Sequence, residues 1–188
     1  MSEPMSLVWP AMEYLRSYAD ALRRGWSPDN LRPEASAEEL ERIASDPELF
    51  VAQQIDRDAK GPPIDLPDGS TVPRLPGYRR WMWDGSFCGV IGFRWQPGTT
   101  DLPPYCLGHI GYSVVPWKRG RGYATHALRA LLPETKEQGL DFVELTTDAT
   151  NEPSRRVIEA NGGQLVERFR KPAVHGGAES LRYRIYVR

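Results

Sequence analysis

The stretch RGRGYATHAL, residues 119–128, decides how this sequence is interpreted. Two glycines, Gly120 and Gly122, stand between arginines, and a helical pattern of small and apolar residues follows at once. The head of a helix carries unpaired backbone N–H groups and partial positive charge. Glycines let a ligand approach these groups closely, and Arg119 and Arg121 add formal positive charge. The stretch therefore predicts a diphosphate-binding turn; the alternative is a helix start with solvated arginines.

The glycine spacing narrows the class of phosphate ligand. A P-loop needs a longer glycine span that ends in Gly-Lys-Ser/Thr, and the sequence has none. A dinucleotide-binding turn is a closer alternative, because Gly120, Gly122 and Thr125 give Gly-x-Gly-x-x-Thr. Glu144 lies about twenty residues further on, where a ribose-binding acid would stand. Against NAD binding, residues 116–119 separate the preceding strand from the glycines, and only one crossover unit follows.

Alternating strand and helix patterns surround the glycine turn. The predicted elements are strands at 79–85 and 86–95 around an Asp84-Gly85 turn, a strand at 106–115, a helix at 122–132, a strand at 142–147, a helix at 151–160, and a closing hairpin of 164–170 and 180–187. The strands that flank the 122–132 helix should be parallel neighbours joined by a crossover. The pattern therefore predicts an α/β (α+β) fold with a mixed sheet flanked by helices.

The first part of the chain is predicted to be helical and then looped. A helix is expected over 10–24, a second one after a capping box of Ser36 and Glu39, and a third over 48–56 behind Asp46-Pro47. Residues 61–77 contain five prolines and three glycines and form a long loop. We interpret it as part of a single domain of residues 1–188, and either a lid over a substrate or a tolerated insertion fits it.

Composition excludes several classes of partner. Lysine plus arginine is 24 and aspartate plus glutamate is 25, so the net charge of −1 favours neither nucleic acid nor an anionic membrane. No apolar run is long enough to span a bilayer. Two cysteines, Cys88 and Cys106, form no disulfide framework, which predicts a reducing, cytoplasmic setting. Cys106 and His109 are two metal-type ligands three residues apart. The sequence offers no second such pair to complete a metal site, so no metal is expected.

The segment Arg119–Ala124 resembles the acetyl-CoA-binding motif of the GNAT superfamily of N-acetyltransferases. That motif reads Arg/Gln-x-x-Gly-x-Gly/Ala, and Arg119, Gly122 and Ala124 match it. HIGYSVVP ahead of it is similar to the family's fourth strand, and NEPSRRVIEANGG is similar to a later helix. The resemblance covers roughly residues 80–187. It implies a mixed, mostly antiparallel sheet flanked by helices, with parallel fourth and fifth strands that splay apart around the cofactor.

The resemblance also implies binding roles. Backbone groups near Val114 and Val115 should bind pantetheine, and Asn151 and Ser154 should line the far side of the cofactor. Asn151 is also a natural helix cap, and both roles are compatible. The diphosphate should lie on the turn formed by Arg119, Gly120, Arg121, Gly122, Tyr123 and Ala124.

Acetyl transfer also needs a base, an oxyanion donor and a proton for the leaving thiolate. Deprotonating a free lysine at pH 7 costs about 4.6 kcal/mol, whereas an α-amino group costs about 1 kcal/mol. Glu144 and His109 are the candidate bases, each with a structural alternative as an ion-paired carboxylate or a satisfied histidine. A strand-end N–H near Val115 is the expected oxyanion donor. Ile158 stands where many GNAT enzymes carry a tyrosine that protonates the thiolate. Either another hydroxyl, that of Tyr112, Tyr123 or Ser154, takes this role, or the thiolate leaves without a dedicated acid.

The sequence thus predicts an acetyl-CoA-dependent N-acetyltransferase in which a primary amine attacks directly. The acceptor would be a small molecule or a protein amine, and the resemblance is compatible with a homodimer. Ile158 motivates an alternative, a catalytically weak GNAT-fold protein that binds acyl-CoA as a sensor. A dinucleotide-binding domain is the second alternative.

Overall fold

The computed structural model describes residues 4–30, 32–66 and 68–187. The elements are, in chain order, β1 (Ser6–Val8), α1 (Met12–Arg23), α2 (Ala35–Ser45), α3 (Pro47–Ala52), β2 (Ile55–Asp56), β3 (Ile64–Asp65), β4 (Thr71–Val72), β5 (Gly77–Trp83), β6 (Phe87–Arg94), β7 (Ile110–Val114), the 3-10 turn η1 (Pro116–Lys118), α4 (Tyr123–Lys136), β8 (Phe142–Asp148), α5 (Glu152–Glu159), β9 (Gln164–Arg170), η2 (Ala173–His175) and β10 (Glu179–Tyr186).

Two antiparallel sheets form the centre of the molecule. The first has the strand order β1-β5-β6-β7, with β2 also paired to β5, and the second has the order β8-β10-β9. Strands β7 and β8 are the neighbours between the two sheets, and the backbone N–H of His109 donates to the Glu144 carbonyl at 2.8 Å. The described residues form no strand ladder between β7 and β8. The predicted fold class, mixed and mostly antiparallel with a splayed central pair, is confirmed.

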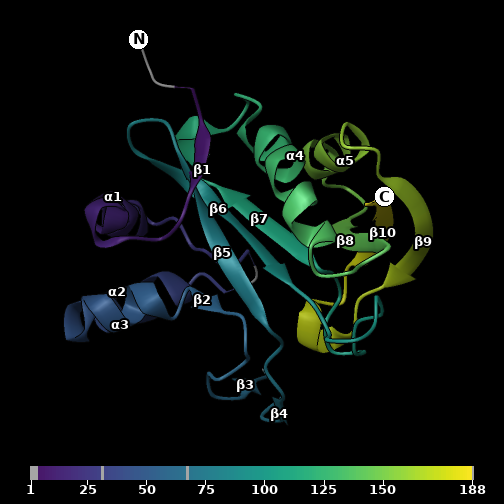
Figure 1. The fold of residues 1–188 in the computed structure, drawn as a ribbon, viewed down its shortest axis with the longest axis horizontal. Helices are drawn as coiled ribbons and strands as arrows, with labels where there is room; N and C mark the ends of the chain where they lie inside the picture. Colours follow the sequence, from purple (N-terminus) through teal and green to yellow (C-terminus); the bar gives the residue numbers. More distant parts are fainter. Residues whose placement is uncertain (1–3, 31, 67, 188) are drawn as a thin grey trace.

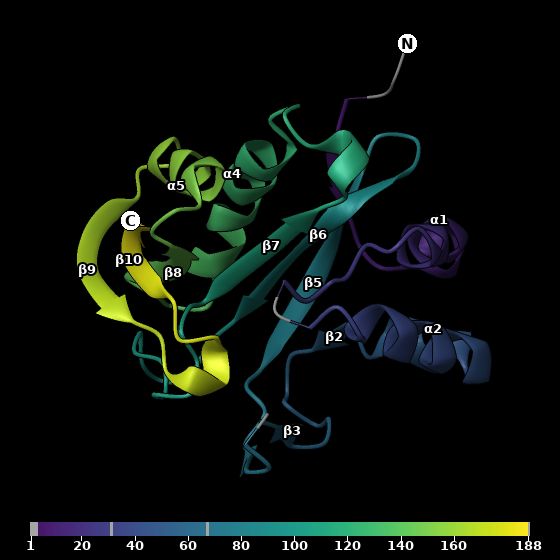
Figure 2. The same cartoon turned by 180° about the vertical axis from the view of Figure 1, so that it is seen from behind.

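Helices cover both faces of the first sheet. Helices α1, α2 and α3 lie on one side of β5 and β6, and α4 and α5 lie on the other (Figures 1 and 2). Helix α1 turns the buried stripe of Leu15, Tyr18 and Leu22 inward, and α4 does the same with Leu128 and Leu131. Both helices that the sequence predicts therefore bury one apolar face.

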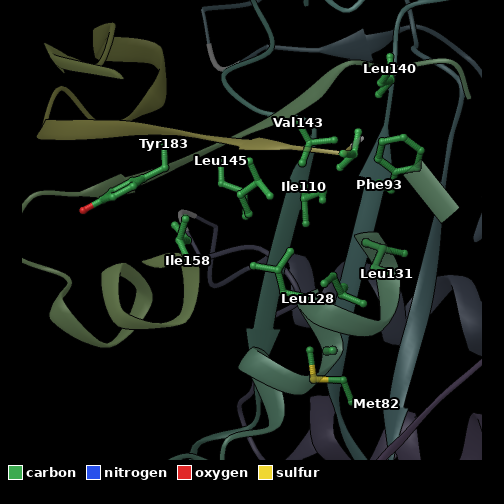
Figure 3. Close-up of a cluster of buried hydrophobic side chains, with 14 of the residues drawn as sticks. Met82, Phe93, Ile110, Leu128, Leu131, Leu140, Val143, Leu145, Ile158 and Tyr183 are labelled. Atoms are coloured by element: carbon green, nitrogen blue, oxygen red, sulfur yellow. The ribbon is translucent and has the colours of Figure 1, made fainter. Parts of the chain in front are cut away.

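The core on the α4 side joins the two sheets. Figure 3 shows Ile110 of β7 beside Val143 and Leu145 of β8, with Leu128 of α4 below them. Ile158 of α5 belongs to the same cluster and is only 1% exposed. Packing across the splayed strands therefore holds the two sheets together where a ladder is missing.

Some predicted boundaries are wrong. Helix α2 begins at Ala35, one residue ahead of Ser36, and Ser36 Oγ donates backward to the Pro33 carbonyl at 2.9 Å. Glu39 does not complete a capping box, because it is buried, accepts from the Tyr18 hydroxyl and pairs with Arg79 at 3.1 Å. Buried partners therefore outcompete the local cap.

Other boundaries move by a few residues. Asp46 does cap α3, since its Oδ1 accepts from the Leu49 N–H at 2.9 Å, but the helix ends at Ala52 rather than continuing to residue 56. The strand expected at 106–115 is confined to β7, and α4 continues through Pro133.

The proline-rich loop 61–77 contains the short β3–β4 ribbon. Arg74 Nε donates to the Pro62 carbonyl at 2.9 Å, which ties the loop to itself. Its role as a lid or as an insertion stays a prediction. None of the helices that the structure describes is long and apolar enough to cross a membrane.

Candidate active site

The glycine turn lies at the head of α4, as predicted. Gly120 and Gly122 have φ angles of 75° and 76°, in the left-handed region that favours glycine. Nothing lies within 4 Å of the position that a Cβ would occupy at either residue. Gly122 is the N-cap of α4 and supplies no side-chain cap, and the His126 N–H donates to its carbonyl at 3.0 Å. The Cβ side of both glycines is therefore open, which permits close approach of a ligand to the head of α4.

Two arginines and a lysine flank the turn, and they differ in their contacts. Arg119 Nε donates to the Val114 carbonyl at 3.2 Å, which links the turn to the end of β7. Arg121 is exposed. Lys118, which immediately precedes the turn, pairs with the buried carboxylate of Asp84.

The free edge of β7 faces β8. The Val115 N–H donates to the Cys88 carbonyl and the Arg94 N–H donates to the His109 carbonyl, both at 2.9 Å. Hydrogen-bonded pairs alternate along an antiparallel ladder, so the backbone groups of Tyr112 and Val114 point away from β6. Val114 therefore lies on the edge where pantetheine is predicted. The N–H of Val115 is already bonded to Cys88, whereas the neighbouring Val114 N–H points away from β6, so the expected oxyanion donor near Val115 stays a prediction.

A pair of hydroxyls joins β7 to α5. Asn151 caps α5, because its Oδ1 accepts from the Ser154 N–H at 3.2 Å. The hydroxyls of Ser154 and Tyr112 lie 2.9 Å apart, and Tyr112 also donates to the Ser154 carbonyl. Burial raises the pKa of Tyr112 to about 12, which keeps it protonated. Ile158 is buried in the core and carries no hydroxyl, whereas Tyr112 and Ser154 supply two hydroxyls between β7 and α5.

Glu144, a predicted base, has both carboxylate oxygens engaged. Arg182 binds Oε2 at 2.9 Å and Arg184 binds Oε1 at 2.8 Å. Burial alone would raise the pKa of Glu144, but the hydrogen bonds from Arg184 and Arg182 outweigh it and hold that pKa below its usual value. A base needs a lone pair that can take a proton, so these contacts favour the ion-paired alternative.

His109, the other predicted base, is also engaged at both ring nitrogens. Its Nδ1 accepts from the Glu144 N–H at 2.9 Å, so the ring proton is assigned to Nε2, which lies 3.0 Å from the Thr100 carbonyl. Burial lowers the pKa of His109. The ring is fully buried and ties the start of β7 to β8. Its catalytic role stays a prediction.

We predict a mainly structural effect for Glu144→Gln. Loss of the charge leaves Arg182 and Arg184 without their anion, so we expect about 2 kcal/mol of lost stability. For a chain of this size that lowers the Tm by about 4–8 °C. The pKa of Glu144 is depressed in the folded state, so its contribution is complete above the unfolded value, near 4.3, and vanishes as pH falls through the folded value.

Thermal unfolding at pH 7 and at pH 3 measures this effect. The Tm gap between wild type and Glu144→Gln should be wide at pH 7 and should narrow at pH 3. Glu167→Gln is the matched control, because Glu167 pairs with Arg182 at 2.8 Å but is half exposed. An unchanged Tm at pH 7, with a large loss of turnover, would instead identify Glu144 as the base.

A surface pocket of about 220 Å³ opens beside the end of β7. The Trp26 indole N–H donates to Ser113 Oγ at 3.0 Å and fixes one wall. Arg119, which binds the Val114 carbonyl, is also a wall residue. The pocket therefore adjoins both the free edge of β7 and the glycine turn. Its other polar lining residues are Ser27, Asp29 and Asn30.

Residues 10–164 match the family model described as the acetyltransferase (GNAT) domain. The chain belongs to this family. The match includes the N-terminal helices, so it begins earlier in the chain than the sequence resemblance, which covers roughly residues 80–187. It ends at the start of β9, ahead of most of the closing hairpin.

Solved structures share the fold of this GNAT domain. The microcin C7 self-immunity acetyltransferase MccE, in complex with acetyl-CoA and AMP, is 14% identical with a TM-score of 0.61, and the match covers 97% of this chain and 92% of that one. A GNAT-family acetyltransferase from Bacillus anthracis is 18% identical with a TM-score of 0.61, covering 100% and 97%. The ribosomal L7/L12 α-N-protein acetyltransferase RimL, in complex with coenzyme A, is 13% identical with a TM-score of 0.60, covering 97% and 93%. None of the curated proteins matches the chain.

Two contacts of the candidate site have no signal in the sequence. The sequence places Asp84 only in a turn, and its contact with Lys118 joins positions that are 34 residues apart. Tyr112 and Ser154 are candidate hydroxyls from the sequence, but their contact joins residues 42 positions apart. Side chains so distant in sequence leave no local pattern. Within the described ranges, no group of three or more His, Cys, Asp or Glu could hold a metal ion.

Proposed function

We propose that this GNAT domain transfers the acetyl group of acetyl-CoA to a primary amine of a small molecule or a protein. The observation that carries the proposal is the open glycine turn at the head of α4, next to the free edge of β7. Together they offer N–H groups for a diphosphate and a strand edge without a ladder partner for an amide-containing arm. The structures of MccE with acetyl-CoA and of RimL with coenzyme A support this choice of cofactor.

The cofactor would lie across both features. Its diphosphate would occupy the turn from Arg119 to Ala124, and its pantetheine arm would follow β7 at Val114. Asn151 and Ser154, at the head of α5, would line the opposite side. The thioester would then reach the hydroxyls of Ser154 and Tyr112, which lie 2.9 Å apart.

The transfer would proceed in one attack without a covalent enzyme intermediate. The amine nitrogen bonds to the thioester carbonyl carbon and the C–S bond breaks. The proton that the amine loses passes to solvent water, and the thiolate gains one proton from a hydroxyl that is reprotonated by water. The Ser154–Tyr112 pair would supply the thiolate proton. Cys88 is not a competing nucleophile, because burial raises the pKa of its thiol to about 12.

The acceptor would enter through the pocket beside Ser113. The carboxylate of Asp29 lines it and favours an approaching ammonium group. Glu144 and His109, the proposed bases, hold their polar atoms in other contacts. An acceptor that loses its proton easily is therefore favoured, and an α-amino group, with a pKa near 7.7–8, meets this need better than a lysine.

Thermal unfolding with acetyl-CoA, CoA and NAD tests the cofactor assignment. At about a hundred times the dissociation constant, a ligand that binds only the folded state stabilises it by about 2.7 kcal/mol. We expect both CoA species to raise the Tm by about 5–10 °C and NAD to leave it unchanged. A shift with NAD alone would favour the dinucleotide alternative, and a shift with CoA but no turnover of any amine would favour a sensor.

Peptide substrates test the class of acceptor. At pH 7.5, a peptide with a free N-terminus and no lysine should show kcat/KM at least about tenfold above that of an N-blocked peptide with one lysine. The advantage should shrink as pH rises toward 10, because the lysine then becomes neutral. An N-blocked peptide without lysine is the control. Equal rates at pH 7.5 would show that a protein base deprotonates the acceptor.

A further inference from the structure

Asp84 lies in the turn between β5 and β6 and reaches both ends of the glycine turn. One carboxylate oxygen accepts from Lys118 Nζ, and the other accepts from the Tyr123 hydroxyl at 2.7 Å. Lys118 immediately precedes the turn 119–122, and Tyr123 is the first residue of α4. Both views place the β5–β6 turn beside η1 (Figures 1 and 2). A single carboxylate thus holds the residues on either side of the glycines.

These contacts are buried and well satisfied. The Asp84 side chain is 4% exposed and that of Lys118 is 11% exposed. Lys118 Nζ also lies 2.6 Å from Ser86 Oγ, so its position is fixed from two sides. Burial would raise the pKa of Asp84, but hydrogen bonds from Lys118 and Tyr123 outweigh it and lower that pKa to about 2. The carboxylate is therefore ionised at any working pH, and it neutralises the charge of Lys118.

The turn between these two anchors makes few side-chain contacts with the rest of the protein. Gly120 and Gly122 contribute no side chains, and α4 lacks a side-chain cap at its head. Arg119 contacts the strand through the Val114 carbonyl, and Arg121 hydrogen-bonds the Tyr123 hydroxyl, which is itself one of the anchored residues. Glycine-rich backbone loses much conformational freedom when it is ordered. Anchors at both ends reduce the freedom that remains to be lost when a ligand binds.

We infer that Asp84 is a positioning residue for the diphosphate-binding turn. It acts through Lys118 and Tyr123 and does not itself touch the cofactor. Lys118 then serves as the link between Asp84 and the turn and is not a phosphate ligand. This inference rests on the proposed function, because it assumes that the turn 119–122 receives the diphosphate of acetyl-CoA.

Asp84→Asn, assayed with two acetyl donors, tests the inference. S-acetylpantetheine carries the same thioester as acetyl-CoA but has no diphosphate. We expect KM for acetyl-CoA to rise about tenfold with kcat within about twofold of wild type, and kcat/KM for S-acetylpantetheine to stay within about twofold. Equal losses with both donors would overturn the inference, since general damage to the fold affects both. No change with either donor would overturn it too.

Asp20→Asn is the matched control. Asp20 makes an exposed ion pair with Arg23 on α1 at 2.7 Å, so the same chemical change there should alter neither kinetic constant. A wild-type protein that shows no binding of acetyl-CoA would refute the proposed function and this inference with it. Binding by wild type and by Asp84→Asn with equal affinity would refute the inference alone.

Two further variants keep the test decisive if Asp84→Asn does not fold. Tyr123→Phe removes one of the two anchors and should raise KM for acetyl-CoA about threefold, with S-acetylpantetheine unaffected. Lys118→Met, alone and combined with Asp84→Asn, completes a double-mutant cycle. The double variant should bind CoA no more weakly than Asp84→Asn, because the anchor is already broken. Additive losses would identify Lys118 as a phosphate ligand and overturn the inference.

Discussion

Gly122→Val should weaken CoA binding by at least about a hundredfold, which corresponds to about 2.7 kcal/mol. Gly122 has a φ of 76°, where a β-branched residue is strained. The strain costs about 1–3 kcal/mol and is relieved only if the turn changes shape, which would turn its N–H groups away from the ligand. The valine would also fill the open space through which phosphate oxygens approach.

A matched control separates strain from lost contact. Gly139, at the other end of α4, has a φ of 75° and equally open surroundings. Gly139→Val should therefore lose a similar amount of thermal stability with no loss of CoA affinity. Calorimetric titration with CoA measures the affinity of both variants. Similar affinities for Gly122→Val and wild type would show that the ligand does not use this turn.

Ser154→Ala should lower kcat by about a hundredfold while KM for acetyl-CoA changes by less than about threefold. Removing a general acid costs about 10²–10⁴-fold in rate, and the loss falls on a step after binding. The substitution leaves the Ser154 N–H bonded to Asn151 and the Tyr112 hydroxyl bonded to the Ser154 carbonyl. The fold of α5 should therefore be retained, as its thermal unfolding can verify.

The second hydroxyl provides the comparison for this variant. If Tyr112 and Ser154 act as a unit, Tyr112→Phe should lower kcat by about tenfold, and the double variant should be no slower than Ser154→Ala. Release of CoA thiol under saturating acetyl-CoA measures these rates. Multiplicative losses would mean that the two hydroxyls act separately, and a full-rate Ser154→Ala would remove both from the proton path.

The fold could be predicted where one local pattern determines it. The Asp84-Gly85 turn between β5 and β6 and the apolar stripe on α4 are local patterns, and all three elements form within a few residues of where they are expected. The predicted capping box at Ser36 is absent because Glu39 is buried and has partners, Tyr18 and Arg79, that lie elsewhere in the chain. Local propensity cannot anticipate a partner 40 residues away.

The candidate site also has features that local sequence determines and features that depend on distant residues. The glycine turn and the Asn151 cap are local, and both adopt the predicted shape. Whether Glu144 has a free oxygen depends on β10, which brings Arg182 and Arg184 across from the far end of the chain. The ion-paired alternative was one of two open interpretations of Glu144, and only the strand register could favour it.

The contact between His109 and Glu144 gives the gap between β7 and β8 a fixed end and an adjustable one. The His109 imidazole and one backbone hydrogen bond connect the two strands at the end where they are adjacent. Beyond that point they share side-chain packing, which tolerates small rotations more readily than a hydrogen-bonded ladder does. The width of the gap at Val114 can thus adapt to the arm that enters it, while the distance at His109 stays constant.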